Sequence, residues 1–214
     1  SYATQKVIEE MGFESEIINY TRYEERYKNL VNTLIKGKKW DKNIITRIIY
    51  KMIQEPNYTK MYRKFEKYRK NFLKESKLEY GNLQELKDNI PEADVYCSGS
   101  DQIWGKIGTV EYDEAYFLKF IEDRTKRCIA YSSSFGKEEI DGSLEKNINK
   151  LLKNYSDILV REDTAKSILK KHGIENVEQV LDPTLLLNKD SNSLIIDSVG
   201  RLVQEIIIFS YSSL

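Results

Sequence analysis

Short apolar runs alternate with amphipathic stretches through the second half of the chain, and this alternation constrains the fold more than any other feature. Strands are predicted at 93–97, 127–131, 157–160 and 177–181, and helices at 144–152 and 162–171. Strands that alternate with helices in this way assemble into a parallel sheet with helices on its faces. The sequence therefore predicts an α/β fold with a Rossmann-like parallel sheet.

The chain opens directly in a helical pattern. Apolar residues recur at helical spacing from Ala3 to Met11, Gly12 follows as a C-terminal stop, and 16–20 is typical of a short strand. In Rossmann-like folds a strand and a Gly-rich loop precede the first helix. We therefore expect that this first strand and its loop are missing from the chain.

A helical insertion is predicted at about 23–78, where apolar residues recur at helical spacing on both sides of Pro56. We interpret it as two or three amphipathic helices, because proline interrupts a helix. Its basic and aromatic residues are compatible with contact to RNA or an anionic glycan, but interleaved Glu and Lys favour a solvated insertion. The insertion belongs to a Rossmann-like domain at 1–190. We expect 191–214 to hold a linker and the start of a truncated C-terminal domain, opened by a strand at 205–211.

Charge and composition argue against several classes of function. Lys plus Arg and Asp plus Glu both number 34, so the formal net charge is +0 and no basic excess points to a nucleic-acid partner. Cys97 and Cys128 lie in apolar runs and are expected to be buried, reduced thiols. No apolar run reaches the ~20 residues of a membrane span, and the first residues do not resemble a signal peptide, so we expect a cytoplasmic protein. Metal-ligand spacings and Gly-rich nucleotide motifs are missing from the sequence, so neither a metal nor a cofactor is predicted.

Polar residues follow three of the predicted strands, at the edge where open α/β sheets bind their ligands. Residues 98–101 offer hydroxyls, backbone N–H groups and a carboxylate, residues 132–134 offer three hydroxyls, and Arg161 can grip a carboxylate or phosphate with two hydrogen bonds. A purely structural role stays open for each of these groups. A Ser-Gly-Ser segment is a common turn, Ser and Asp after a strand can cap a helix, and Arg161 can simply pair with Glu162 or Asp163.

Five segments, in order along the chain, resemble the signature motifs of the polysaccharide pyruvyl transferase family. They are 94–104 (DVYCSGSDQIW), 116–120 (YFLKF), 130–136 (AYSSSFG), 160–162 (VRE) and 181–187 (LDPTLLL). Several of them fall where a predicted strand meets a loop, and together they span about 93–188. Five motifs in the correct order make the resemblance far more specific than any one of them.

The resemblance implies the N-terminal half of a two-domain fold like that of the B-type glycosyltransferases. It also implies an enzyme that transfers a pyruvyl group from phosphoenolpyruvate to two hydroxyls of a sugar in a surface or capsular polysaccharide, forming a ketal. On this basis we assign catalytic roles to Asp101 and Arg161. Substrate binding is assigned to Ser98, Gly99, Ser100, Gln102, Ser132, Ser133 and Ser134. Phosphoenolpyruvate and a saccharide acceptor are the expected partners, with peripheral membrane association if the acceptor is lipid-linked.

Two alternatives remain open at this stage. The first is a nucleotide-sugar glycosyltransferase of the same architecture, and the second is a non-catalytic binding module. Members of the family also have a Gly-rich loop before the first helix and a complete second half, which we expect to be missing here. We therefore expect this chain by itself to be inactive, and the oligomeric state is left open.

Overall fold

The computed structural model describes residues 2–26, 29, 35, 43–106, 112–186 and 205–209, the last range by its backbone. The strands are β1 (Glu14–Tyr20), β2 (Glu75–Tyr80), β3 (Val95–Ser98), β4 (Arg127–Ser133), β5 (Tyr155–Val160), β6 (Val177–Gln179) and β7 (Glu205–Phe209). The α-helices are α1 (Tyr2–Glu10), α3 (Ile44–Phe72), α4 (Leu83–Asp88), α5 (Gly142–Leu152) and α6 (Asp163–Lys171). Two 3₁₀ helices are η2 (Glu114–Phe117) and η3 (Pro183–Leu186).

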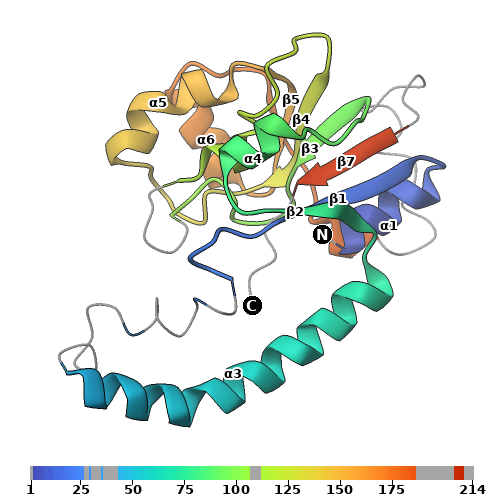
Figure 1. Cartoon of the computed structure of the whole chain (residues 1–214). Coiled ribbons are helices and arrows are strands. Elements are labelled where there is room, and N and C mark those ends of the chain that lie inside the picture. Colours follow the sequence, from blue (N-terminus) through green and yellow to red (C-terminus); the bar gives the residue numbers. More distant parts are fainter. Residues whose placement is uncertain are drawn as a thin grey trace.

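The described strands form one seven-stranded sheet in the order β2-β1-β7-β3-β4-β5-β6 (Figure 1). Every pairing between neighbouring strands is parallel. The predicted α/β fold with a Rossmann-like parallel sheet is therefore confirmed. The strands and helices expected between 93 and 187 all form, with ends that differ from the prediction by a few residues.

Strand β7 lies in the middle of the sheet, paired with β1 on one side and β3 on the other. From this central position the chain order runs outward both ways, as in doubly wound sheets. This corrects the expectation that a strand at 205–211 opens a second domain, because 205–209 belongs to the first sheet. Its sequence includes the continuous apolar run 206–209, which suits a strand covered on both faces.

Alternate side chains of the strands enter two apolar cores, one on each face of the sheet. On one face, Tyr96 and Cys128 pack in the cluster that also contains the buried residues of α4, α5, α6 and η2. On the other face, Cys97, Ile129 and Tyr131 pack with residues of α1 and η3. This period of two along the strands explains why helices are needed on both faces.

The two cysteines confirm the prediction of buried, reduced thiols. Both are free and buried. They lie on neighbouring strands but point to opposite faces, since Cys97 belongs to one core and Cys128 to the other. Burial raises the pKa of Cys97 to about 12 and that of Cys128 to about 11, so both thiols stay protonated at neutral pH.

The helical insertion differs from the prediction in two ways. Helix α3 runs through Pro56, where the sequence predicted an interruption between helices. The expected number of two or three helices stays a prediction, because 27–28, 30–34 and 36–42 lie outside the described residues. Proline removes one backbone hydrogen bond without ending the helix, which begins at the N-cap Asn43, where the side chain accepts a 2.9 Å hydrogen bond from the Ile45 N–H. The insertion also ends before 78, because β2 at 75–80 joins the sheet beside β1.

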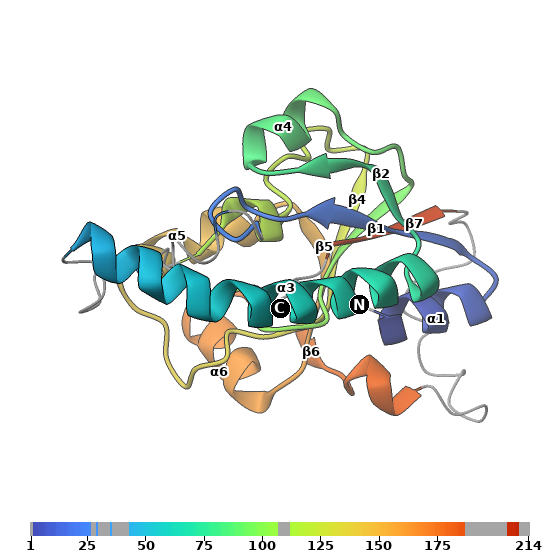
Figure 2. The ribbon, with the colours of Figure 1, turned by 60° about the horizontal axis from the view of Figure 1, so that its bottom comes forward.

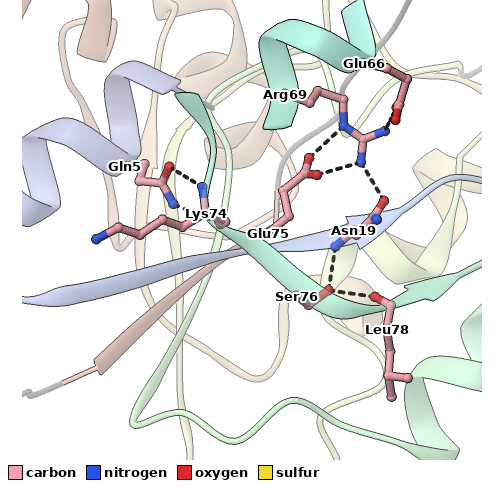
Figure 3. Close-up of polar contacts among 8 residues, drawn as sticks. All are labelled: Gln5, Asn19, Glu66, Arg69, Lys74, Glu75, Ser76 and Leu78. Carbon is pink, nitrogen blue, oxygen red and sulfur yellow. Dashed lines mark hydrogen bonds and ion pairs between the residues drawn. The ribbon is translucent and has the colours of Figure 1, made fainter. Parts of the chain in front are cut away.

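The C-terminal end of α3 is fastened to the sheet by Arg69 (Figure 3). The guanidinium donates two hydrogen bonds to Glu75, at 2.7 and 2.9 Å, and one of 2.7 Å to the Asn19 side chain. A further bond of 3.0 Å reaches Glu66 on α3 itself. Because Asn19 lies on β1 and Glu75 on β2, one side chain joins the helix to the edge strand β2 and to its neighbour β1.

Candidate functional site

The carboxyl ends of all strands lie at one edge of the sheet, because every pairing is parallel. The direction of the chain order reverses beside β3, where Ser98 stands opposite Phe209 of β7. In doubly wound sheets this switch point is where ligands bind. The loops that follow β3, β4 and β5 carry the polar residues that the sequence singles out.

Gly99 lets the loop after β3 lie directly against β4. Its φ of +136° belongs to the region that favours glycine, and a Cβ built on it would stand 1.9 Å from the Tyr131 carbonyl oxygen. Backbone atoms cannot move away as a side chain would, so only glycine fits. The requirement for glycine here is one of backbone packing, and the next two residues, Ser100 and Asp101, are half-buried.

Three of the serines predicted to bind substrate are fully buried and bonded within the protein. The Ser98 hydroxyl lies 2.9 Å from the Tyr155 hydroxyl, and the Ser133 hydroxyl donates a 2.9 Å bond to the Ser98 carbonyl. The Ser134 hydroxyl accepts a 2.9 Å bond from the Gly136 N–H. These bonds hold the loops after β3 and β4 together at the edge of the sheet.

Ser132 stands apart from the other serines. Its φ is +54°, and the register between β4 and β5 shifts between Tyr131 and Ser133, which makes Ser132 the extra residue of a β-bulge. The side chain is fully buried, and its hydroxyl has no hydrogen-bond partner in the part of the chain that the structure describes. An unsatisfied buried hydroxyl is unfavourable, so its presence beside the loops of the candidate site calls for a structural or functional explanation.

Three predicted residues of the loop after β3 reach the surface. Ser100 is half-buried, and its hydroxyl lies 2.9 Å from that of Thr4 on α1. The Asp101 carboxylate accepts a 2.8 Å bond from the Gln102 N–H, and the Asp101 carbonyl accepts from the Ser134 N–H at 3.1 Å. Gln102 is exposed and lies against Gly136.

Arg161 follows β5 at the same edge. Its Nε donates a 2.7 Å hydrogen bond to Glu162, and its Nη1 lies 3.4 Å from an oxygen of Asp182. About a quarter of the Arg161 side chain is exposed. Its backbone N–H donates to the Ser133 carbonyl at 3.2 Å, which places the arginine beside the loop after β4.

Asp182 completes this cluster and was not singled out from the sequence as a site residue. Burial alone would raise its pKa, but hydrogen bonds from the hydroxyl and N–H of Thr184, together with Arg161, outweigh burial and lower the pKa below its ordinary value. Asp182 is therefore an anion at neutral pH. Its nearness also adds to the burial that raises the pKa of Tyr131, which keeps that phenol protonated.

Backbone hydrogen bonds thus hold the predicted residues together at the carboxyl edge of the sheet. The loop after β3 contacts the loop after β4 through Asp101 and Ser134, and the latter contacts Arg161 through Ser133. Sequence reasoning missed Thr4 and Asp182, both of which contact a predicted residue. The turn Asp182-Pro183 after a strand was the available signal for Asp182, whereas nothing local distinguishes Thr4 from an ordinary helix residue.

Metal-ligand clusters and membrane-spanning helices are both absent from the described residues. Within them, no group of three or more His, Cys, Asp or Glu side chains could hold a metal ion. Nor does any helix described here have the length and apolar character needed to cross a membrane.

The fold and the edge define the class of protein: a doubly wound α/β protein with hydroxyls, a carboxylate and a paired arginine at the carboxyl ends of its strands. Comparison with known families identifies it further. The polysaccharide pyruvyl transferase family matches residues 1–213, so the chain belongs to this family. The same chain has no significant match among curated proteins or solved structures.

Proposed function

We propose that the protein transfers a pyruvyl group from phosphoenolpyruvate onto a sugar of a surface or capsular polysaccharide. Membership of the family supports a transferase that acts on polysaccharide. The proposed reaction adds a proton to the methylene of the enol ester, lets two sugar hydroxyls attack the central carbon, and releases phosphate. The product is a cyclic ketal that carries the carboxylate of the donor.

The observation that carries the proposal is the arginine after β5. Arg161 is partly exposed at the ligand edge and already holds two carboxylates, those of Glu162 and Asp182. A guanidinium in this position suits the carboxylate or phosphate of phosphoenolpyruvate, because its planar fork matches both anions. The donor would take the place of at least one of the two carboxylates.

Roles for the other residues follow from their exposure. Asp101 and Gln102 are the outward-facing polar groups of the loop after β3, and we assign them, with Ser100, to the saccharide and to proton transfer. Asp101 has the chemistry of a general acid or base. Ser98, Gly99, Ser133 and Ser134 shape the loops that present these groups. Ser132 is equally buried, and it stays assigned to substrate binding because its hydroxyl has no hydrogen-bond partner among the described residues.

A further expectation belongs to the same proposal. We place the reaction in the cytoplasm, with the acceptor carried on a lipid. We also propose that the domain built on the seven-stranded sheet, which includes β7 as well as the predicted range 1–190, is the N-terminal half of a B-type two-domain architecture. These assignments draw on the family and on the Rossmann-like sheet.

The test is an assay of the protein that carries this chain, with phosphoenolpyruvate and candidate saccharides. Acceptor-dependent release of phosphate is the expected result. Thermal stabilisation separates the competing functions, because a ligand that binds only the folded state raises its melting temperature. Stabilisation by phosphoenolpyruvate agrees with pyruvyl transfer. Stabilisation by nucleotide-sugars alone would identify a glycosyltransferase, and a response to neither would favour a binding module.

A further inference from the structure

Helix α3 carries an apolar face that no described element covers. Its first three turns place six apolar side chains in two adjacent rows, at positions i, i+4 and i+8 of each row. The members are Ile44, Ile48 and Met52 in one row and Ile45, Ile49 and Ile53 in the other, with exposed fractions between 45% and 74%. None of the 29 residues of α3 is buried.

The C-terminal half of α3 carries a basic face. Lys60, Arg63, Lys64 and Lys67 are all exposed and line one shallow groove with Pro56 and Thr59. At 3.6 residues per turn, the centre of this basic group lies within about 60° of the centre of the apolar group around the helix axis. The two groups therefore form one continuous surface, apolar at its N-terminal end and basic at its C-terminal end, which we call the α3 face.

The opposite side of the C-terminal half holds α3 on the body. Arg69 binds Glu75 and Asn19, while Tyr68 and Phe72 make edge contacts with Tyr2 of α1. The α3 face consequently points away from the sheet. Figure 1 shows the helix leaving the body near β2, and Figure 2, in which the bottom of the molecule comes forward, shows its length uncovered by other described elements.

The charge of α3 indicates what the face binds. The helix contains eight Lys and Arg residues and two Glu residues, although the whole chain has formal net charge +0. The basic excess is therefore concentrated on one protruding element. An exposed apolar surface of this extent marks an interaction site, and basic residues beside it are suited to an anionic partner.

We propose that the α3 face docks onto the surface of an anionic lipid bilayer. The isoleucines and Met52 would enter the boundary between headgroups and acyl chains, and the four basic side chains would lie over lipid phosphates, as in amphipathic helices that lie on membranes. Symmetric pairing with a second copy fits less well. A parallel arrangement would oppose basic groups to basic groups, and an antiparallel one would oppose basic groups to apolar ones.

This inference goes beyond the proposed reaction and does not depend on it, because it is tested without any substrate. The protein that carries this chain is sedimented with vesicles of phosphatidylcholine alone and of phosphatidylcholine with phosphatidylglycerol. Binding is expected to the anionic vesicles, to be weaker on the neutral ones, and to fall as salt is added.

Two double variants test the two ends of the face. Ile48→Asn with Met52→Asn, and Lys60→Gln with Lys64→Gln, should each weaken binding to anionic vesicles by about tenfold or more. Matched controls are Leu78→Asn with Ile90→Asn for exposed apolar residues, and Lys170→Gln with Lys171→Gln for exposed lysines on α6. The controls should bind as the wild type does. Met52→Asn alone serves if the first double variant loses its helical circular dichroism.

Three results would overturn the proposal. The first is that the wild type fails to bind the anionic vesicles, or binds neutral ones equally well. The second is that the controls lose as much binding as the face variants. The third is a wild-type dimer that the apolar variant turns into a monomer without any change in vesicle binding, which would assign the α3 face to a second copy of the chain.

Discussion

The hydroxyl oxygens of Thr4 and Ser100 lie 2.9 Å apart, and this contact joins the first turn of α1 to the loop after β3. Thr4 is buried, and Ser100 is half-buried at the ligand edge. Because α1 also packs against η3, which follows Asp182, the helix touches the loops on both sides of the candidate site. The position of the loop after β3 therefore depends on a residue almost a hundred positions earlier in the chain.

Replacement of Thr4 by valine should loosen this loop. Thr4→Val keeps the branched shape but removes the hydroxyl, which leaves Ser100 without that partner and should lower the free energy of unfolding by about 1 kcal/mol. Pyruvyl transfer should fall severalfold, because Ser100 and Asp101 are no longer held in place. Thr4→Ser retains the hydroxyl and is the control. Equal activity in Thr4→Val and the wild type would show that the contact has no functional part.

The sequence predicts the second half of the sheet well and the first half less well, for physical reasons. Runs such as 127–131 and 157–160 are apolar enough to require burial, so their strands could be recognised locally. Strand β2 has a charged residue at every second position, and only two of its six side chains are buried. Its sequence therefore lacks an apolar run and resembles the charged helix that precedes it. The place of β7 depends on pairing with strands far away in the chain, which no local pattern records.

For the candidate site, the sequence identifies the edge of the sheet where the polar residues gather. It does not show which of their side chains are buried and hydrogen-bonded within the protein. Ser98, Ser133 and Ser134 look like ligand-binding hydroxyls in sequence, and the structure shows each of them bonded inside the protein. Small polar residues at strand ends serve loop packing and ligand binding alike. Exposure distinguishes the two roles, and exposure is fixed by the neighbouring strands.

Arg161→Lys should impair use of the donor. Lysine keeps the positive charge but cannot make two parallel hydrogen bonds to one anion, so kcat/KM for phosphoenolpyruvate should fall at least about tenfold, equivalent to ~1.4 kcal/mol. Arg127→Lys is the matched control, because Arg127 also pairs with an aspartate but stands at the amino end of β4, away from the ligand edge. Wild-type kinetics in Arg161→Lys would end the assignment of this residue to the donor.

Asp182→Asn should reveal a dependence of stability on acid pH. The folded state lowers the pKa of Asp182, so its contribution is complete above the ordinary value of about 4 and is lost as pH falls through the lowered pKa. At neutral pH the variant should be less stable by about 0.5–1 kcal/mol, and this difference should vanish in strong acid. Urea unfolding of both proteins at a series of pH values measures it. A difference that stays constant down to the acid limit contradicts the ion pair with Arg161.

Arg69→Lys should weaken the attachment of α3. The side chain is largely covered and bonds Glu75, Glu66 and Asn19 at once, and lysine cannot reproduce this arrangement, so the free energy of unfolding should fall by about 1–3 kcal/mol. Arg63→Lys, on the exposed side of the same helix, should change it by less than about 0.5 kcal/mol. Chemical denaturation of the two variants compares them directly, and equal stabilities would mean that Arg69 does not fasten the helix.

Ser132 and Ser133 are adjacent, both fully buried, and should respond to alanine with opposite signs. Ser133→Ala removes a hydroxyl that donates to the Ser98 carbonyl and should lower the free energy of unfolding by about 1 kcal/mol. Ser132→Ala removes a hydroxyl without a partner among the described residues, so the cost of its burial disappears and stability should rise by about 1 kcal/mol. Serine and alanine both carry a Cβ, so the φ of +54° at position 132 imposes the same backbone strain in the wild type and in Ser132→Ala.

Activity decides what the Ser132 hydroxyl is for. If the bulge aims it at a substrate or at a water that bridges to one, Ser132→Ala should be more stable than the wild type and yet transfer pyruvyl groups about tenfold more slowly, the loss expected for one hydrogen bond in the transition state. Thermal unfolding and phosphate release, measured on the same preparations, give both quantities. A variant that gains stability and keeps full activity would make Ser132 a packing residue of the bulge and remove it from the site.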